Sequence, residues 1–182
     1  DNGGILFLTS NAASSEVLGF EVEGTVKATK NLELRAAYGY SAGEYDEFTG
    51  CTPDGTASGT DCSGNDLQKS PKNNFSASVQ YESEVSSAWN FMLRAEYSYL
   101  DSNFNDALNN PQREMPSYEL VNARAGFISV DGRYRVMAWV RNAFEEDYID
   151  GINLGSPPGA AGGVYYSVNQ PRTYGLELRA KF

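Results

Sequence analysis

The sequence contains no histidine, and this absence removes the side chain that proteins use most often as a general base and as a metal ligand. It excludes a histidine-based catalytic triad and argues against an ordinary hydrolase or zinc enzyme, so we expect no enzymatic activity, no metal and no cofactor. Basic residues are also scarce: 14 Lys and Arg stand against 24 Asp and Glu, giving a net charge of −10. This balance argues against nucleic acid as a partner.

Long apolar runs are missing as well. The mean hydropathy is −0.46, and no stretch approaches the roughly 18 to 20 consecutive apolar residues that a membrane-spanning helix needs. A helical membrane protein is therefore excluded, whereas a β-barrel is not, because barrel strands give a much weaker hydropathy signal. The length of 182 residues fits one ordinary domain and no more than two.

Only two cysteines occur, Cys51 and Cys62, in a segment rich in Gly, Ser, Thr and Asp. Two thiols without any imidazole cannot supply the four ligands of a zinc site. We predict a disulfide that closes this loop, which indicates an oxidising compartment such as a periplasm or a cell surface. The alternative is a pair of free thiols, although free cysteines are usually buried rather than placed in such a loop.

Apolar and polar residues alternate along most of the chain, as is typical of β-strands. Several of the alternating segments need about ten residues or more, whereas strands of soluble proteins cluster near five or six. With a short run at Ile5–Thr9 they predict an all-β, antiparallel fold of about eight strands. The other segments are 20–29, 32–40, 74–82, 89–99, 121–127, 134–141 and 173–182.

The connections between these segments alternate in length. Tight turns are expected at 30–31, 84–88 and 130–133, and long polar loops at about 46–70, 101–117 and 149–170. Short turns at one rim and long loops at the other are typical of an outer-membrane barrel.

Each strand has an apolar and a polar face, and the polar face carries charges of both signs. In a barrel the apolar face contacts lipid and the charged face lines a wet or salt-bridged lumen. The alternative is the solvated outer face of a soluble sheet.

Aromatic residues are expected near the strand ends, in two girdles at the headgroup layers, with ordinary core aromatics as the alternative. The loop-side girdle is Tyr40, Tyr45, Phe48, Tyr99, Phe104, Tyr118, Phe144 and Tyr148; the turn-side girdle is Tyr81, Trp89, Phe91, Phe127, Tyr134 and Phe182.

Five segments carry a more specific signal. They are 19–23 (Gly-Phe-Glu-Val-Glu), Leu67 with 70–81 (Ser-Pro-Lys-Asn and the strand after it), 117–127, 141–148 (Arg-Asn-Ala-Phe to Asp-Tyr) and 171–182. In this order they resemble motifs of TonB-dependent outer-membrane receptors, with Ala143 where the family usually has Leu. The resemblance covers Gly19 to Phe182.

This resemblance implies an antiparallel transmembrane β-barrel in the Gram-negative outer membrane. Residues 1–182 would form about eight C-terminal strands of a barrel of about 22, with no plug domain among them. Because the chain opens at Asp1 without an initiator Met or a leader, we expect it to be cleaved, truncated or only part of a receptor. Two alternatives stay open: an autonomous eight-stranded barrel with a structural or adhesive role, and a soluble secreted sandwich that binds carbohydrate.

The resemblance further implies transport of a scarce ligand: a ferric siderophore, cobalamin or an oligosaccharide. The implied partners are the receptor's plug and other barrel strands, the inner-membrane TonB complex acting through the plug, the barrel assembly machinery, and outer-membrane lipid and lipopolysaccharide. The C-terminal strand would present the assembly signal through Tyr174, Leu176, Leu178, Ala180 and Phe182.

Ligand contacts are expected from Tyr165 and Tyr166, beside the glycine-rich loop 151–163, and from the loop bounded by Cys51 and Cys62. Girdle or loop packing is the alternative for the two tyrosines. Asp54, Asp61 and Asp66 are candidate ligands for Ca²⁺. Solvated loop charges are the simpler explanation for these three residues and for the acidic segment 145–147.

Overall fold

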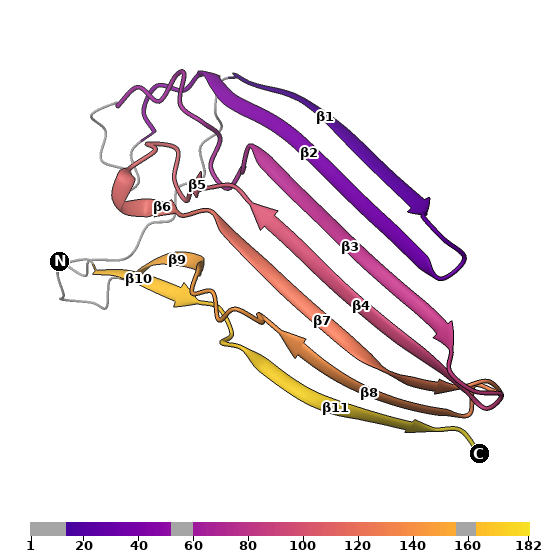
Figure 1. Cartoon of the computed structure of the whole chain (residues 1–182). Coiled ribbons are helices and arrows are strands. Elements are labelled where there is room, and N and C mark those ends of the chain that lie inside the picture. Colours follow the sequence, from indigo (N-terminus) through magenta and orange to yellow (C-terminus); the bar gives the residue numbers. More distant parts are fainter. Residues whose placement is uncertain (1–13, 52–59, 156–162) are drawn as a thin grey trace.

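The computed structural model describes residues 14–51, 60–155 and 163–182, and its main feature is one curved sheet (Figure 1). The sheet has seven strands in the order β1-β2-β3-β4-β7-β8-β11, and every neighbouring pair is antiparallel. The strands are β1 (Ser14–Lys27), β2 (Leu32–Glu47), β3 (Asn73–Glu84), β4 (Trp89–Leu100), β7 (Tyr118–Ser129), β8 (Tyr134–Arg141) and β11 (Thr173–Ala180). The predicted antiparallel all-β fold is confirmed, and the short run 5–9 lies outside the described residues.

The connections are sorted between the two ends of the sheet. Tight turns join β1 to β2, β3 to β4 and β7 to β8 at one end, where the chain also finishes, and the long connections gather at the other end (Figure 1). The long connections are more regular than expected. They hold the pairs β5 (Asn103–Phe104) with β6 (Glu114–Met115), and β9 (Ile149–Gly155) with β10 (Gly163–Val168), as well as the 3₁₀ helix Pro111–Arg113.

The register gives the sheet two chemically different faces, because residues directly opposite each other in a ladder share a face. One row of the outer face crosses the whole sheet and is apolar: Val26, Leu34, Val79, Ala95, Ala123, Val140 and Tyr174. The corresponding row of the inner face is largely polar: Lys27, Glu33, Gln80, Arg94, Arg124, Trp139 and Gly175. The alternation seen in the sequence is therefore the alternation of the sheet.

The apolar face is uncovered over the described residues. Leu18 is 70 % exposed, and Leu176 and Leu178 are each 75 % exposed, whereas a soluble sandwich would bury such residues against a second sheet. The strands β1 and β11 end the sheet, each paired on one side only within the described chain, so the sheet does not close on itself. The uncovered apolar face does not favour the soluble sandwich, and the open sheet does not favour the autonomous eight-stranded barrel. The described residues include no helix that is long and apolar enough to cross a membrane.

The expected aromatic girdles are found in part. Phe91 and Phe127 of the turn-side set have rings 5.6 Å apart near the turn end. At the loop end the rings of Phe75 and Tyr97, which were not assigned to a girdle, are 5.9 Å apart. Tyr45 departs from this expectation, because it is buried near the end of β2, where its ring centroid lies 5.0 Å from that of Phe48.

Candidate functional site

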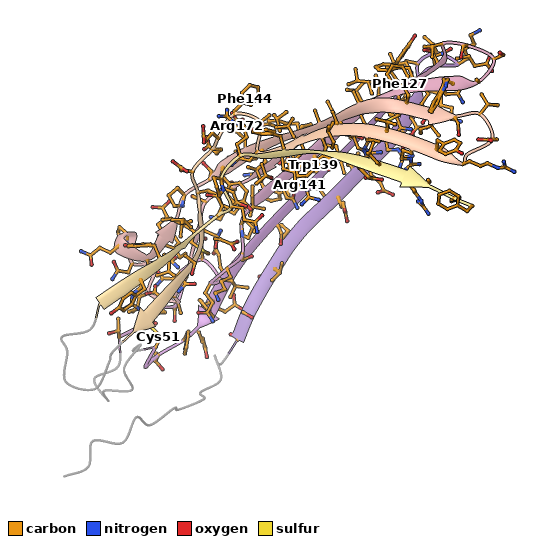
Figure 2. The ribbon with its side chains drawn as sticks, turned by 90° about the horizontal axis from the view of Figure 1, so that it is seen from below. Cys51, Phe127, Trp139, Arg141, Phe144 and Arg172 are labelled. Carbon is orange, nitrogen blue, oxygen red and sulfur yellow. A yellow bond between two sulfur atoms is a disulfide. The ribbon has the colours of Figure 1, made fainter. Side chains whose placement is uncertain are left out.

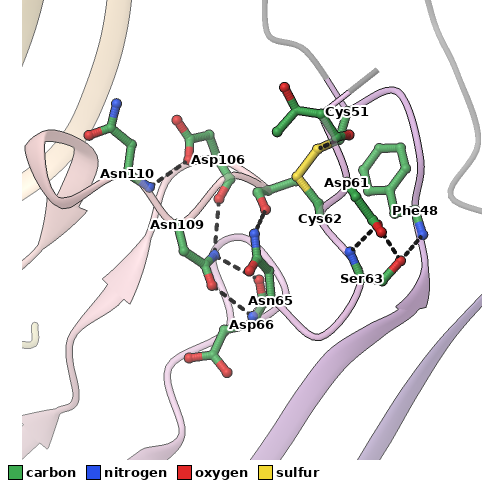
Figure 3. Close-up of a disulfide and its surroundings, with 12 residues drawn as sticks. Phe48, Cys51, Asp61, Cys62, Ser63, Asn65, Asp66, Asp106, Asn109 and Asn110 are labelled. Atoms are coloured by element: carbon green, nitrogen blue, oxygen red, sulfur yellow. Dashed lines mark hydrogen bonds between the residues drawn. A yellow bond between two sulfur atoms is a disulfide. The ribbon is translucent and has the colours of Figure 1, made fainter. Parts of the chain in front are cut away.

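The predicted disulfide is present: Cys51 and Cys62 are bonded in the connection between β2 and β3 (Figure 3). Cys62 is fully buried. Beside it, the carboxylate of Asp61 accepts hydrogen bonds from the backbone N–H of Ser63 at 2.9 Å and from its hydroxyl at 2.6 Å. The side-chain hydrogen bond, followed by the backbone one, lowers the pKa of Asp61. The residues around the bridge are therefore fixed by local polar contacts.

The connection that carries the disulfide is tied to the connection between β4 and β7 (Figure 3). The backbone N–H of Asp66 donates to Asn109 Oδ1 at 2.8 Å, and Asn109 Nδ2 donates back to the Asp66 carbonyl at 3.0 Å. Asn65 Nδ2 donates to the Ala107 carbonyl at 2.8 Å. Asn109 has a φ of 51°, in the left-handed region that Asn adopts more readily than most residues. Two loops distant in sequence thus form one unit.

The connection between β8 and β11 joins this unit. Asn105 Nδ2 donates to the Ile152 carbonyl at 3.0 Å, and the hydroxyl of Tyr166 donates to the Gln112 carbonyl at 3.2 Å. A cavity of about 340 Å³ lies among the three connections and is lined in part by Asn103, Asn105 and Asp150. The Oδ1 atoms of Asn103 and Asn105 are buried and have no hydrogen-bond partner within the described chain.

The two tyrosines proposed as ligand contacts lie on the strand β10. Tyr165 is 54 % exposed and Tyr166 is 49 % exposed. Because they are consecutive in a strand, their side chains point to opposite faces. Tyr166 is held by the hydrogen bond from its hydroxyl, and Tyr165 is the more exposed of the two. Their role as ligand contacts stays a prediction.

The segment 141–148, one of the family-like motifs, builds the turn that leaves β8. Asn142 is buried with a φ of 50°, its Oδ1 accepts from the Glu146 N–H at 2.8 Å, and its Nδ2 donates to the Glu146 carbonyl at 2.9 Å. Its own N–H donates to Asn122 Oδ1 at 3.0 Å, which ties the turn to β7. The motif ends at Tyr148, whose ring stacks on Tyr118 with centroids 3.8 Å apart. Tyr118, the first residue of β7, lies opposite Leu100 on the inner face and is therefore not part of a lipid-facing girdle.

The acidic residues considered for Ca²⁺ have other partners where they are described. Asp54 lies outside the described residues, Asp61 binds Ser63, and Asp66 forms an ion pair with Lys72 at 2.8 Å. In the part of the chain that the structure covers, no cluster of three or more His, Cys, Asp or Glu residues is arranged to hold a metal ion. In the segment 145–147, Glu145 forms an ion pair with Arg172 at 2.9 Å.

The inner face of the sheet carries charged side chains, and several are paired along their own strand. Arg35 bonds Glu33 at 2.6 Å, and Arg94 bonds Glu96 at 2.6 Å and Gln80 at 3.1 Å. These pairs agree with the salt-bridged lumen expected from the sequence. A cavity of about 400 Å³ lies beside them over β4, β7 and β8, and its lining includes Arg94, Arg124, Trp139 and Arg141. Of these residues, Trp139 and Arg141 are labelled on β8 in Figure 2.

The last strand presents the residues assigned to the assembly signal. Tyr174, Leu176, Leu178 and Ala180 stand opposite Val140, Ala138, Val136 and Tyr134 of β8, on the apolar outer face. Phe182 follows the strand and is fully exposed. The position suits a signal that a partner protein must read, and the role itself stays a prediction.

An antiparallel sheet with an exposed apolar face, a charged inner face and all its long loops at one rim defines a segment of an outer-membrane-type β-barrel wall. Residues 1–143 match the family model described as "TonB dependent receptor-like, beta-barrel". The chain belongs to the TonB-dependent receptors, a family of outer-membrane barrels. A search of the curated proteins finds no match to this sequence.

Solved structures agree on the fold. The ferric yersiniabactin uptake receptor FyuA from Yersinia pestis has a TM-score of 0.73 at 18 % identity, covering 92 % of this chain and 24 % of that receptor. The siderophore receptor PiuA from Acinetobacter baumannii has a TM-score of 0.69 at 22 % identity, and the match covers 92 % of this chain and 22 % of that receptor. The ferric preacinetobactin receptor BauA, also from A. baumannii, has a TM-score of 0.63 at 17 % identity, and the match covers 90 % of this chain and 21 % of that receptor. This chain therefore spans about a quarter of the receptors it matches.

Proposed function

We propose that this chain is part of the barrel of a TonB-dependent transporter in the Gram-negative outer membrane, and that the transporter takes up a ferric siderophore. The observation that carries the proposal is the two-faced sheet, because a charged inner face and an apolar outer face suit a wall between lumen and lipid. The three interlocked loops supply a surface for ligand capture. The chain's role is recognition and passage, without covalent chemistry.

The siderophore is favoured over cobalamin and oligosaccharides because three solved receptors that are similar to this chain in fold are named for siderophores. The partners follow from the family: a plug within the barrel, the remaining strands of the receptor, and the inner-membrane TonB complex that acts on the plug. Lipid, lipopolysaccharide and the barrel assembly machinery would contact the outer face and the C-terminal strand.

The experiment is an uptake assay in cells that lack the receptor containing this chain. Labelled ferric siderophores, cobalamin and oligosaccharides are offered separately, with and without a functional TonB complex. We expect uptake of one ferric siderophore to be lost both on deletion and on TonB loss. If deletion leaves the uptake of all three classes of ligand unchanged, the proposed transport function is refuted. If deletion abolishes the uptake of cobalamin or an oligosaccharide instead, the protein is a transporter but the proposed ligand class is wrong.

The loop tyrosines are tested in the same assay. Tyr165→Ala and Tyr166→Ala should each raise the KM for uptake at an unchanged outer-membrane level, because both side chains are exposed on β10. Tyr134→Ala, which removes an exposed tyrosine at the turn end, is the matched control. Equal effects from all three substitutions would remove the tyrosines from the ligand site.

A further inference from the structure

The cavity of about 340 Å³ at the loop end receives polar groups from all three long connections. Lys69 belongs to the connection between β2 and β3, and Asp150 belongs to β9 in the connection between β8 and β11. Asn103 and Asn105 belong to the connection between β4 and β7. We call this space the junction cavity, because its set of polar groups is complete only where the three connections meet.

Two residues of the junction cavity carry acceptors that the chain does not satisfy. Asn103 and Asn105 are two positions apart in an extended segment, so their side chains lie on the same side of it. The amide of Asn105 is fixed in orientation, because its Nδ2 donates to the Ile152 carbonyl at 3.0 Å. Both Oδ1 atoms are buried and lack a partner within the described chain. Unpaired buried acceptors are unfavourable, so the two oxygens favour a ligand group that donates hydrogen bonds.

The junction cavity also has an unpaired charge of each sign. Within the described residues neither Lys69 nor Asp150 forms an ion pair, and they are not paired with each other. The backbone of Lys69 is held against β5, because its N–H donates to the Phe104 carbonyl at 2.7 Å. Two separate charges of opposite sign complement a ligand group that itself carries both charges.

The junction cavity lies on the lumen side of the sheet. Leu100 and Tyr118 line it and stand opposite each other in the register, on the same face as Arg94 by the alternation along β4. The lining also includes the apolar side chains of Met115 and Ile149. A ligand that enters the barrel from the loop end therefore meets a space with apolar walls and a few polar groups, as is typical of small-molecule sites.

We propose that the junction cavity binds a zwitterionic, amino-acid-like end group of the transported ligand. The ammonium of this group donates to the Oδ1 atoms of Asn103 and Asn105 and is neutralised by Asp150, and its carboxylate pairs with Lys69. The volume is near the low end of the roughly 300–1,000 Å³ of ligand pockets, which suits an end group rather than a whole ligand. The proposal rests on the proposed function, because it assigns the group to the ligand that the transporter takes up.

The test uses the full receptor purified in detergent and measures the binding of three probes by saturation-transfer NMR. L-norleucine carries both charges and an apolar chain, and N-acetyl-L-norleucine carries only the carboxylate. L-norleucine amide carries only the ammonium at a pH of about 6.5, below the α-amino pKa of about 7.7–8.0. We expect L-norleucine to bind at least about threefold more tightly than either derivative. Equal binding of the three probes, or binding of none, would overturn the proposal.

Variants of the receptor assign each charge of the probe to its partner. Lys69→Gln should weaken the binding of L-norleucine about threefold and leave that of the amide unchanged. Asp150→Asn should weaken both L-norleucine and its amide and leave N-acetyl-L-norleucine unchanged. Lys30→Gln in the turn between β1 and β2 and Asp147→Asn are the matched controls, because neither residue lines the cavity. A folding defect would weaken all probes alike, so the same loss for every probe in both variants would contradict the assignment.

The two proposals fail separately. If the receptor transports its ligand but does not distinguish the three probes, only the assignment of the junction cavity is wrong. If the probes bind in the expected pattern but deletion of the receptor leaves the uptake of all ligand classes unchanged, the transport function is wrong and the cavity is a binding site without a role in uptake.

Discussion

Trp139 lies across Gly175 on the neighbouring strand, on the inner face of the sheet. A Cβ atom added at Gly175 would be 2.8 Å from Trp139 Cζ2 and 3.0 Å from Cε2. Real Cβ atoms do not approach a ring so closely, so the missing side chain creates the space that the indole fills. The position of Arg141 over the indole depends on the same space.

Gly175→Val should displace the indole and reduce stability. Overpacking of this kind costs about 1–3 kcal/mol. The measurement is tryptophan fluorescence during urea unfolding of the full receptor, in a Trp89→Phe background that leaves Trp139 as the only tryptophan of this segment. Gly24→Val is the control, because a Cβ at Gly24 meets no atom within 4 Å. Equal destabilisation by both substitutions would mean that the Trp139 contact is unimportant.

Asn142→Ala should loosen the turn after β8. It leaves the N–H and the carbonyl of Glu146 without their partners, and each lost hydrogen bond at such a buried position costs about 1–3 kcal/mol. Asn142→Gly removes the same bonds but accommodates the φ of 50°, so it should be less destabilising than Ala. Protease cleavage within the β8–β11 connection measures the effect. An Ala variant as resistant as the wild type would contradict this role.

Much of the sheet could be predicted from the sequence, and the reason is physical. Lipid on one side and water or charged groups on the other impose a strict period of two, so the strands near Leu34, Val79 and Phe127 were found from alternation. Alternation predicted less of the strands beyond the apolar band. The alternating segment 20–29 begins later than β1 does at Ser14, and β2 continues to Glu47, because the backbone pairing between β1 and β2 extends beyond the residues that alternate clearly.

The site was less predictable, because it depends on contacts between segments distant in sequence. The alternation of the sequence predicts a charged inner face, but only the register between β4 and β7 places Arg94 opposite Arg124. The reciprocal bonds of Asp66 and Asn109 join two loops with no shared motif. The strands β5 and β6 are too short to show a period, so the sequence predicts only a loop for the region that contains them.

Removal of the disulfide should affect the loops and spare the sheet. Cross-linking a loop of this length contributes about 2–3 kcal/mol in the chain-entropy model. The double substitution Cys51→Ser and Cys62→Ser should therefore increase protease cleavage between β2 and β3, while heat-modifiable migration of the receptor stays unchanged. Reduction of the wild-type receptor should reproduce the effect and leave the double variant unaffected. An unfolded barrel after either treatment would show a wider role for the bridge.

Acid should weaken the loop end of the sheet through Asp101, which follows the last residue of β4. Asn73 Nδ2 donates to its carboxylate at 2.5 Å, and the Ser102 N–H donates at 3.0 Å. The hydrogen bond from Asn73 is the main cause that lowers the pKa of Asp101 below 3.8. The folded pKa lies below the unfolded one, so this stabilisation is present above the unfolded pKa and is lost as the pH falls through the folded pKa.

Asp101→Asn should therefore reduce stability at pH 7 and flatten its decline below a pH of about 4. The free energy of unfolding in urea, measured for the full receptor at pH 7 and below a pH of about 4, tests this expectation. Asp147→Asn, an exposed carboxylate in the β8–β9 connection, is the control and should leave the acid dependence unchanged. An unaltered acid dependence in the Asp101 variant would contradict the assignment.

Phe182→Ala should impair assembly of the barrel far more than ligand binding. The last described backbone hydrogen bond of the chain's end runs from the Lys181 N–H to the carbonyl of Arg133, in the turn before β8, at 2.9 Å, and Phe182 lies beyond it, fully exposed. Its loss removes little folded-state packing, so any large effect must come from recognition during insertion. Receptor in outer-membrane fractions should fall sharply for Phe182→Ala and stay normal for Val130→Ala, an exposed apolar residue at the same end of the sheet. Normal outer-membrane levels of the Phe182 variant would refute the C-terminal signal.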